Sequence, residues 1–145
     1  MIDDEAELVE TGKILSNART IAIVGLSDNQ SKPSYEVANF LADKGYKVVG
    51  VNPAITKSGN IEVYPDLASV PFEIDIINVF RRSENIPEII PQVLLKNPKS
   101  LWLQQGIRND VAVEPVIKKG LFVMQDKCIA VYYNLCKPYF ANTVQ

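Results

Sequence analysis

Short apolar runs alternate with longer amphipathic segments along most of this chain. The runs lack regular polar alternation, which is typical of strands buried on both faces of a parallel sheet. The segments between them carry apolar residues at helical spacing, as Val37, Ala38 and Leu41 do within 34–44. Five strands are therefore predicted, at 20–24, 47–51, 75–80, 100–104 and 121–125.

Residues that cap or break helices predict where the helical segments begin and end. Ser34, Ser83 and Asn109 are expected to be the N-caps of three helices that follow the first, third and fourth strands. Gly45 is expected to end the first of these helices. A leading amphipathic helix is expected over 3–17, ahead of the first strand.

This alternation predicts an α/β fold, a doubly wound parallel sheet of five strands with helices on both faces. We expect the strand order 3-2-1-4-5, with ligands bound beyond the carboxyl ends of the strands, where strands 1 and 4 diverge. The length of 145 residues points to one domain, 1–145. Within it, 1–18 form the leading helical segment and 132–145 a C-terminal tail.

Composition narrows the classes of partner. A net charge of −2 provides no general attraction to nucleic acid or to acidic membranes. No apolar run approaches the roughly 18 residues of a membrane span. The acidic start, MIDDEAELVE, is the opposite of a signal peptide, and two cysteines make no disulfide framework. We expect a cytoplasmic protein that binds neither nucleic acid nor membrane.

The chain contains no histidine, which removes several kinds of chemistry. Ser-His-Asp and Cys-His catalysis, a phosphohistidine intermediate and histidine metal ligands are all impossible. Cys128 and Cys136, eight residues apart, do not match zinc-site spacing, so no metal is expected. No paired base and nucleophile is visible. The residues favour binding over catalysis without excluding an enzyme.

The residues that follow the predicted strands define a cationic edge. Parallel strands bring their carboxyl ends to one side of the sheet, so these residues should lie together. They include two arginines, a lysine, two amides and a thiol, which suit an anionic small molecule. They are Gly25–Ser27, Asn52 and Pro53, Val79–Arg82, Gln104–Gly106, and Lys127 with Cys128.

The loop after the first predicted strand has the features of a phosphate-binding site. Gly25 permits a tight turn, Lys32 supplies a charge, and Pro33 fixes the backbone that enters the helix. Ser34 and the unpaired amides at the helix start can hold an anion. An ordinary connection with a serine cap is the alternative, although the loop is longer than the usual two to six residues.

Two common nucleotide sites are not encoded here. Of the three glycines in the dinucleotide motif G-x-G-x-x-G, Gly25 alone is present. Asn52 stands where an acidic residue would hold the ribose of NAD. The ATP-binding motif GxxxxGK[ST] does not occur either.

Six segments in order resemble a known family. They are VGLSDNQSKPSYEVANFL, GYKVVGVNP, YPDLASVP, DIINVFRRSENIP, LWLQQGIRND and DKCI. Together they look like the small stand-alone CoA-binding proteins, which are similar to the CoA-binding domain of the succinyl-CoA synthetase α subunit. The resemblance covers about residues 13–131. It implies a Rossmann-like fold that binds coenzyme A or an acyl-CoA.

The resemblance also implies which residues hold the ligand. The pyrophosphate and adjacent groups would lie on the first loop, and Asn52 and Pro53 would border the adenosine. Residues around the end of the third strand would line the cleft. Gln104 and Gly106 follow from the WLQ motif of Trp102, and Cys128 matches the family's cysteine. The loop residues are Gly25, Leu26, Ser27, Lys32, Pro33, Ser34 and Tyr35, and the cleft residues are Val79, Phe80, Arg81 and Arg82.

The sequence departs from the family pattern at two places. The family often has Arg-Pro-Ser in the first loop, where Lys32 here keeps the charge. After the cysteine the family often has an acid and a histidine, where this chain has Ala130 to Tyr133. The synthetases also use a phosphohistidine on another domain, and that route is closed to this chain.

Several residues allow two interpretations of their role. Arg81 and Arg82 are either a phosphate clamp, with Arg81 preferred, or a solvated pair with a salt bridge to Glu84. Trp102 is expected in the core, and Tyr35 either in the core or as a ligand wall. Cys128 is either a small apolar residue or, helped by Lys127, a thiol that forms a mixed disulfide with CoA.

We therefore predict non-catalytic binding of coenzyme A or an acyl-CoA, for CoA sensing, protection or thiol redox. One alternative is a redox sensor that binds NAD(H) or another nucleotide. Another is a CoA-binding subunit of an acyl-CoA synthetase-type enzyme with a separate partner chain. A partner protein or a homo-oligomer is left open.

Overall fold

The computed structural model describes residues 5–143, with side chains described up to residue 140. Within residues 5–143, seven strands form one sheet. The order across the sheet is β3-β4-β2-β1-β5-β6-β7, and every pairing is parallel except β3 with β4. The strands are β1 (Thr20–Val24), β2 (Lys47–Val51), β3 (Lys57–Ser58), β4 (Ile61–Tyr64), β5 (Ile76–Val79), β6 (Ser100–Leu103) and β7 (Phe122–Met124).

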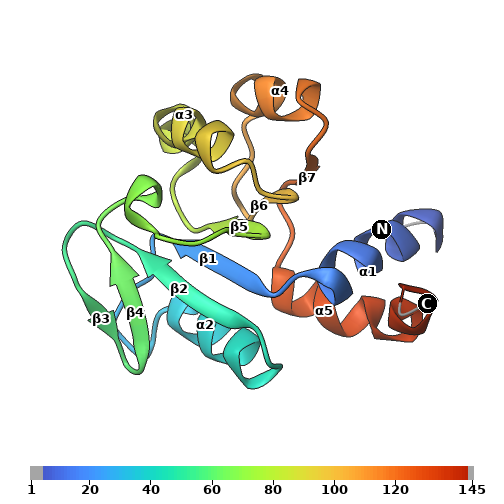
Figure 1. The fold of residues 1–145 in the computed structure, drawn as a ribbon, viewed down its shortest axis with the longest axis horizontal. Helices are drawn as coiled ribbons and strands as arrows, with labels where there is room; N and C mark the ends of the chain where they lie inside the picture. Colours follow the sequence, from blue (N-terminus) through green and yellow to red (C-terminus); the bar gives the residue numbers. More distant parts are fainter. Residues whose placement is uncertain (1–4, 144–145) are drawn as a thin grey trace.

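Helices cover both faces of this sheet, as Figure 1 shows. The helices α1, α2 and α5 lie on one face, and α3 and α4 lie on the other. The described α-helices are α1 (Glu5–Asn17), α2 (Pro33–Asp43), α3 (Ile86–Lys96), α4 (Asp110–Lys118) and α5 (Ile129–Cys136), and the 3₁₀ segments are η1 (Leu67–Ser69), η2 (Ser83–Asn85) and η3 (Lys137–Thr143).

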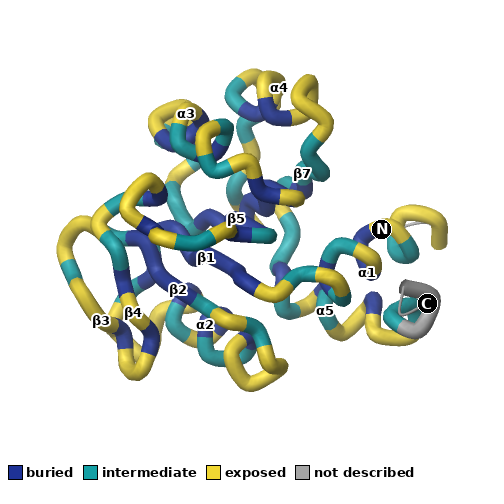
Figure 2. The backbone as a smooth tube through the Cα atoms, viewed as in Figure 1, coloured by how far each residue is buried: buried dark blue, intermediate teal, exposed yellow. Residues whose placement is uncertain are grey.

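The central strands supply both halves of the core. Every residue of β1, β5 and β6 is buried, so alternate side chains enter opposite cores. Ala22 and Val24 pack toward α3 and α4, whereas Ile21 and Ile23 pack toward α1, α2 and α5. Figure 2 shows the resulting buried layer along the middle of the molecule, between exposed helix faces.

The predicted α/β class, the mostly parallel sheet and the two helical layers are confirmed, but the five-stranded sheet is wrong. The sequence pattern missed β3 and β4, because β4 alternates buried and exposed residues over only four positions. The order 3-2-1-4-5 is also wrong. The third predicted strand, β5, pairs with β1, and β4 takes the place outside β2. The switch in strand order therefore lies between β1 and β5.

Two of the three predicted N-caps are wrong. Lys32 is the N-cap residue of α2, and Ser34 lies in the first turn, because Pro33 already starts the helix. Ser83 opens the 3₁₀ segment η2, and its Oγ accepts a hydrogen bond from Arg108 N instead of capping α3. Asn109 is confirmed as a cap, since its Oδ1 accepts from Ala112 N at 3.0 Å.

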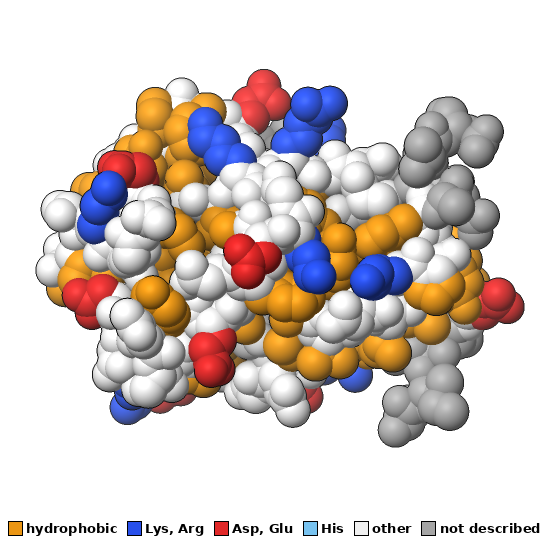
Figure 3. Space-filling view, turned by 90° about the horizontal axis from the view of Figure 1, so that it is seen from below, with side chains coloured by type: hydrophobic (Ala, Val, Ile, Leu, Met, Phe, Trp, Pro, Cys, Tyr) orange, Lys and Arg blue, Asp and Glu red, His pale blue; other side chains and the backbone are white. Residues whose placement is uncertain are grey.

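The two ends of the described chain pack together, as Figure 1 shows for α1, α5 and η3. Gly12 lies inside α1 and faces this contact, where a Cβ atom would come within 3.3 Å of Tyr139 Cβ. The aromatic ring of Tyr133 in α5 makes edge contacts with Phe40, Tyr46 and Phe140. Figure 3 views the side on which α2 and α5 lie and shows apolar side chains spread across it.

Between residues 5 and 143, the helices are all too short or too polar to traverse a lipid bilayer.

Tyr46 gives this packing a measurable pH dependence. Its hydroxyl donates to the carbonyl of Leu15, and burial, with a smaller contribution from Tyr133, raises the pKa of Tyr46 well above its usual value of about 10. The unfolded chain therefore ionises first. The stabilisation by neutral Tyr46 is complete below about pH 10 and is lost as the pH rises toward the folded-state pKa.

The substitution Tyr46→Phe should lower the free energy of unfolding by about 1 kcal/mol at pH 8, because one hydrogen bond is lost. Above pH 10 the difference from the wild type should fall, by up to about 1.4 kcal/mol per pH unit, and should change sign by about pH 11. Urea unfolding of both proteins at pH 8, 10 and 11 measures this. A difference that stays constant over this range would contradict the assignment.

Candidate ligand-binding site

A hollow of about 620 Å³ opens at the carboxyl edge of the sheet. Its walls come from the start of α2, from the segments after β5 and β6, and from the loop that leads from β7 into α5. Seven of its residues were predicted from the sequence: Pro33, Phe80, Arg81, Arg82, Gln104, Gly106 and Cys128. Gln105 was placed at this edge without being assigned to the ligand, and three residues were missed: Glu36, Val37 and Ile107.

The missed residues lie close in sequence to residues that were predicted. Glu36 and Val37 lie one helical turn after Pro33, on the side of α2 that faces the opening. Ile107 directly follows Gly106. The turn spacing of a helix could have indicated the first pair. We call this hollow, defined by its eleven lining residues, the main cleft.

Gly25 brings the first loop close to β5. Its φ of +88° is a left-handed conformation, and a Cβ atom there would lie 2.5 Å from the carbonyl oxygen of Phe80. Gly25 N also donates to Val51 O at 2.8 Å. A larger residue would therefore both strain the backbone and push β1 and β5 apart where the main cleft begins.

The serines of the first loop hold the loop in place. Ser34 Oγ accepts from Ser27 N at 3.0 Å, and Ser58 Oγ donates to Ser27 O at 2.7 Å. These bonds attach the loop to both α2 and β3. Of this loop, Pro33 lines the main cleft, and Lys32 is exposed at the N-cap position of α2.

Other predicted site residues lie beside the main cleft. The amide of Asn52 is used within the protein, since Nδ2 donates to Leu26 O at 2.9 Å and Oδ1 accepts from Ala54 N at 2.8 Å. Leu26 and Val79 are fully buried, so neither residue is open to a ligand. Tyr35 is half-buried near Gly59, a position that fits both a core residue and a wall of the ligand site.

A second cavity of about 150 Å³ lies next to the main cleft, and Pro53 borders it. Pro53 also borders a shallower hollow of about 390 Å³ with Asp28 and Lys57. Arg81 lines both the main cleft and the second cavity. The arginine side chain therefore stands between the two spaces.

Both arginines after β5 line the main cleft, so adjacent positions do supply one site here. Arg81 Nη2 lies 3.6 Å from Glu88 Oε1, so its acidic neighbour is Glu88 and not Glu84. An ion pair this exposed contributes little stability and can open. The main cleft has two arginines against one acid, Glu36, so it is locally cationic although the chain is net negative.

Gln104 contributes a buried amide to the main cleft. It is 7% exposed, and its Oε1 accepts from Asn78 Nδ2 and from Ile129 N, each at 3.3 Å. Its Nε2 takes part in no hydrogen bond within residues 5–143. Asn78 Oδ1 is buried and also lacks a partner in the described part of the chain. Gln104 Nε2 can therefore donate to a ligand in the main cleft, and the unused acceptor of Asn78 lies next to Gln104.

Cys128 lies where the main cleft meets α5. It is half-buried and occupies the N-cap position of that helix. The ammonium of Lys127 lies over the ring of Tyr132, 6.0 Å from its centroid. Trp102, confirmed as a core residue, anchors this loop because its Nε1 donates to Lys127 O at 2.9 Å. Cys136 is fully buried in α5, as expected for a packing residue.

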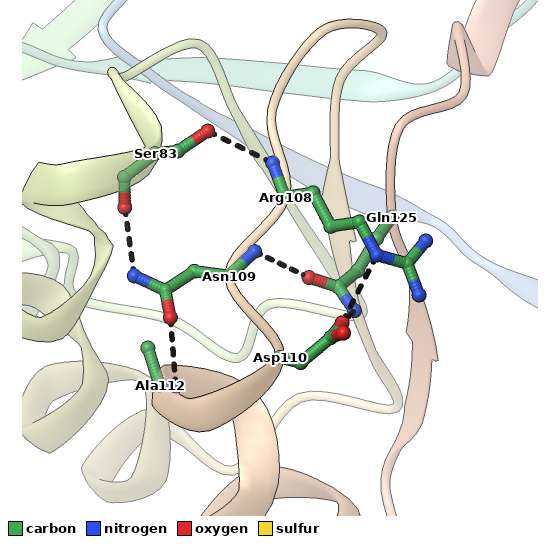
Figure 4. Close-up of polar contacts among 6 residues, drawn as sticks. All are labelled: Ser83, Arg108, Asn109, Asp110, Ala112 and Gln125. Atoms are coloured by element: carbon green, nitrogen blue, oxygen red, sulfur yellow. Dashed lines mark hydrogen bonds and ion pairs between the residues drawn. The ribbon is translucent and has the colours of Figure 1, made fainter.

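A polar network (Figure 4) joins the segments next to Arg82 and Ile107, the two cleft residues that we call the far wall of the main cleft. Asn109 Nδ2 donates to Ser83 O at 2.9 Å, and Asn109 N donates to Gln125 Oε1 at 2.8 Å. Asp110 accepts from Gln125 Nε2 and pairs with Arg108 Nε, each at 3.0 Å. The network joins η2, the loop before α4 and the end of β7.

Comparison with known proteins gives the family. A model of the CoA binding domain matches residues 19–134, and the chain belongs to this family. An uncharacterised protein of Bacillus subtilis, YneT, is 36% identical over 128 residues, which cover 88% of this chain and 95% of that one.

Solved structures agree with the family assignment. A Thermus thermophilus protein called cell-free ID.343 has a TM-score of 0.84 at 30% identity, covering 92% of this chain and 99% of its own. The dinucleotide-forming acetyl-coenzyme A synthetase 1 of Korarchaeum cryptofilum has a TM-score of 0.70 at 21% identity. That likeness covers 83% of this chain and 30% of the synthetase, and it concerns the fold.

Asn109 should be the residue on which the far wall of the main cleft depends most. The substitution Asn109→Ala removes both the cap of α4 and the bond to Ser83, so it should lower the free energy of unfolding by about 1–2 kcal/mol. Asn109→Asp keeps the cap acceptor and should lose about half as much. Urea unfolding measures both.

Asn85 is a matched control for this prediction. It occupies the N-cap position of α3 but makes no capping hydrogen bond with its side chain. Asn85→Ala should therefore stay within about 0.5 kcal/mol of the wild type. Equal losses at positions 85 and 109 would show that the network does not support the wall.

Proposed function

We propose that this chain binds coenzyme A along the carboxyl edge of its sheet, with the nucleotide toward β2 and the thiol toward β7. The family supports coenzyme A as the ligand. The observation that carries the placement is Arg81, which lines both the main cleft and the second cavity. A cation between two spaces suits a ligand whose phosphates join a nucleotide to a long arm.

The order of groups along the edge matches the order of groups in the ligand. Pro53 follows β2, the first loop follows β1, Arg81 follows β5, Gln104 follows β6, and Cys128 follows β7. Four strand spacings separate β2 from β7, which is roughly 19 Å at about 4.8 Å each. An extended ligand is needed to span such an edge.

The phosphates would be held from two sides. Arg81 and Arg82 provide guanidinium groups, which form short, charge-assisted hydrogen bonds to phosphate. The N-terminal end of α2, with Lys32 exposed at its cap, provides backbone amides and the positive end of the helix dipole. The loop bonds between Ser27 and Ser34 keep this end of α2 in place.

The pantetheine arm would occupy the main cleft beyond the arginines. Val37, Phe80 and Ile107 provide an apolar wall for its methylene and methyl groups. The unpaired Nε2 of Gln104 can donate to an amide carbonyl of the arm. Asn52 and Pro53 would border the adenosine, as the sequence predicted, with the second cavity beside them.

Calorimetric titration with coenzyme A, acetyl-CoA, NAD and ATP tests this proposal. Coenzyme A or acetyl-CoA should bind, and NAD and ATP should bind far more weakly because they lack the arm that fills the main cleft. Arg81→Ala or Arg82→Ala should weaken binding about 10- to 100-fold, the equivalent of one charge-assisted hydrogen bond.

Arg19→Ala is the matched control, because Arg19 is exposed at the opposite, amino end of β1. It removes the same charge and should leave the affinity for coenzyme A unchanged. Equal weakening by Arg19→Ala would mean that only overall charge matters. Binding of NAD as tight as that of coenzyme A would overturn the proposal in favour of a dinucleotide site.

A further inference from the structure

Cys128 lies where the proposed ligand would place its own sulfur. It is the last of the cleft residues in strand order, and it is half-buried, so its thiol can be reached from the main cleft. This inference rests on the proposed function, because the ligand must be a thiol-ended nucleotide. A cysteine by itself would indicate nothing, and the polar atoms around it provide the second observation.

These polar atoms belong to Gln104 and Asn78, next to the start of the helix at Cys128. The next residue, Ile129, donates its backbone N–H to the 7% exposed side chain of Gln104. Gln104 faces the main cleft with an unpaired Nε2, and Asn78 Oδ1 beside it is buried without a partner in the described chain. Such groups favour a polar ligand end here over an apolar one.

We infer that Cys128 is a thiol–disulfide exchange site for the disulfide of coenzyme A. The Cys128 thiolate attacks one sulfur of the symmetrical disulfide, forming a protein–CoA mixed disulfide and releasing one CoA thiolate. The bond between the two CoA sulfurs breaks as the bond to Cys128 forms. The disulfide is the oxidant, one of its two CoA halves leaves reduced, and the proton of Cys128 passes to water or buffer.

The geometry favours Cys128 over the other cysteine. Cys136 is fully buried in α5, away from the main cleft, so a bulky disulfide cannot reach it. Cys128 stands at the N-terminal end of the same helix and lines the main cleft, so it is open to a disulfide bound there.

The consequence is a reversible block of the ligand site by an oxidised form of its own ligand. The nucleotide of the bound half stays in the cleft, so the adduct should form by recognition and not by general thiol reactivity. Excess free thiol reverses the exchange. The protein would thus hold coenzyme A covalently under oxidising conditions and release it under reducing ones.

The test is intact-mass spectrometry of the reduced full chain, freed of reductant, during incubation with coenzyme A disulfide. One adduct should form, at least about tenfold faster than with glutathione disulfide at equal concentration, because binding raises the local concentration of the reacting sulfur. Desulfo-CoA, which binds without a sulfur, should slow it. Dithiothreitol should remove it.

Peptide mapping of the wild type locates the adduct even if a variant fails to fold. The adduct should map to Cys128, disappear in Cys128→Ser and persist in Cys136→Ala. An adduct on Cys136, equal rates with the two disulfides, or no adduct would each overturn the inference. Calorimetry with desulfo-CoA separates the two proposals: if it binds but the disulfide gives no adduct, exchange fails while coenzyme A binding stands.

Discussion

Burial of β1, β5 and β6 on both faces is the constraint on which this molecule depends. Side chains from these strands fill the cores beneath α1, α2 and α5 on one side and α3 and α4 on the other. Polar side chains that must meet a ligand are therefore left to the strand ends. Asn78, buried within β5, donates a hydrogen bond to Gln104, which lines the main cleft at the end of β6.

The edge of the sheet is held by contacts that leave little freedom. Gly25 allows the backbone to approach Phe80 at a distance no other residue permits. Ser34 holds the first loop, and Asn109 ties η2 to the start of α4. A site organised before its ligand arrives spends less free energy on ordering when it binds. The exposed Arg81–Glu88 pair is the contact that can rearrange.

The charged residues of the main cleft differ in sign from the net charge of the whole chain. The chain is net negative, yet its main cleft combines Arg81 and Arg82 with a single acid. A local excess of positive charge favours small anions even when the net charge of the whole protein is negative. The family supports coenzyme A as the ligand, and the proposed arrangement places Cys128 at one end of the main cleft.

The sequence by itself determined the class of fold, the main strands and most of the cleft residues. Strands buried on both faces leave an apolar run, and the residues after each run must lie at one edge. Tertiary structure decided the rest. The place of β5 beside β1 depends on crossovers, and β4 is an edge strand too short for a clear pattern. Only the folded chain shows that Ser34 binds the first loop and that Glu88 pairs with Arg81, because both contacts join segments that no local pattern relates.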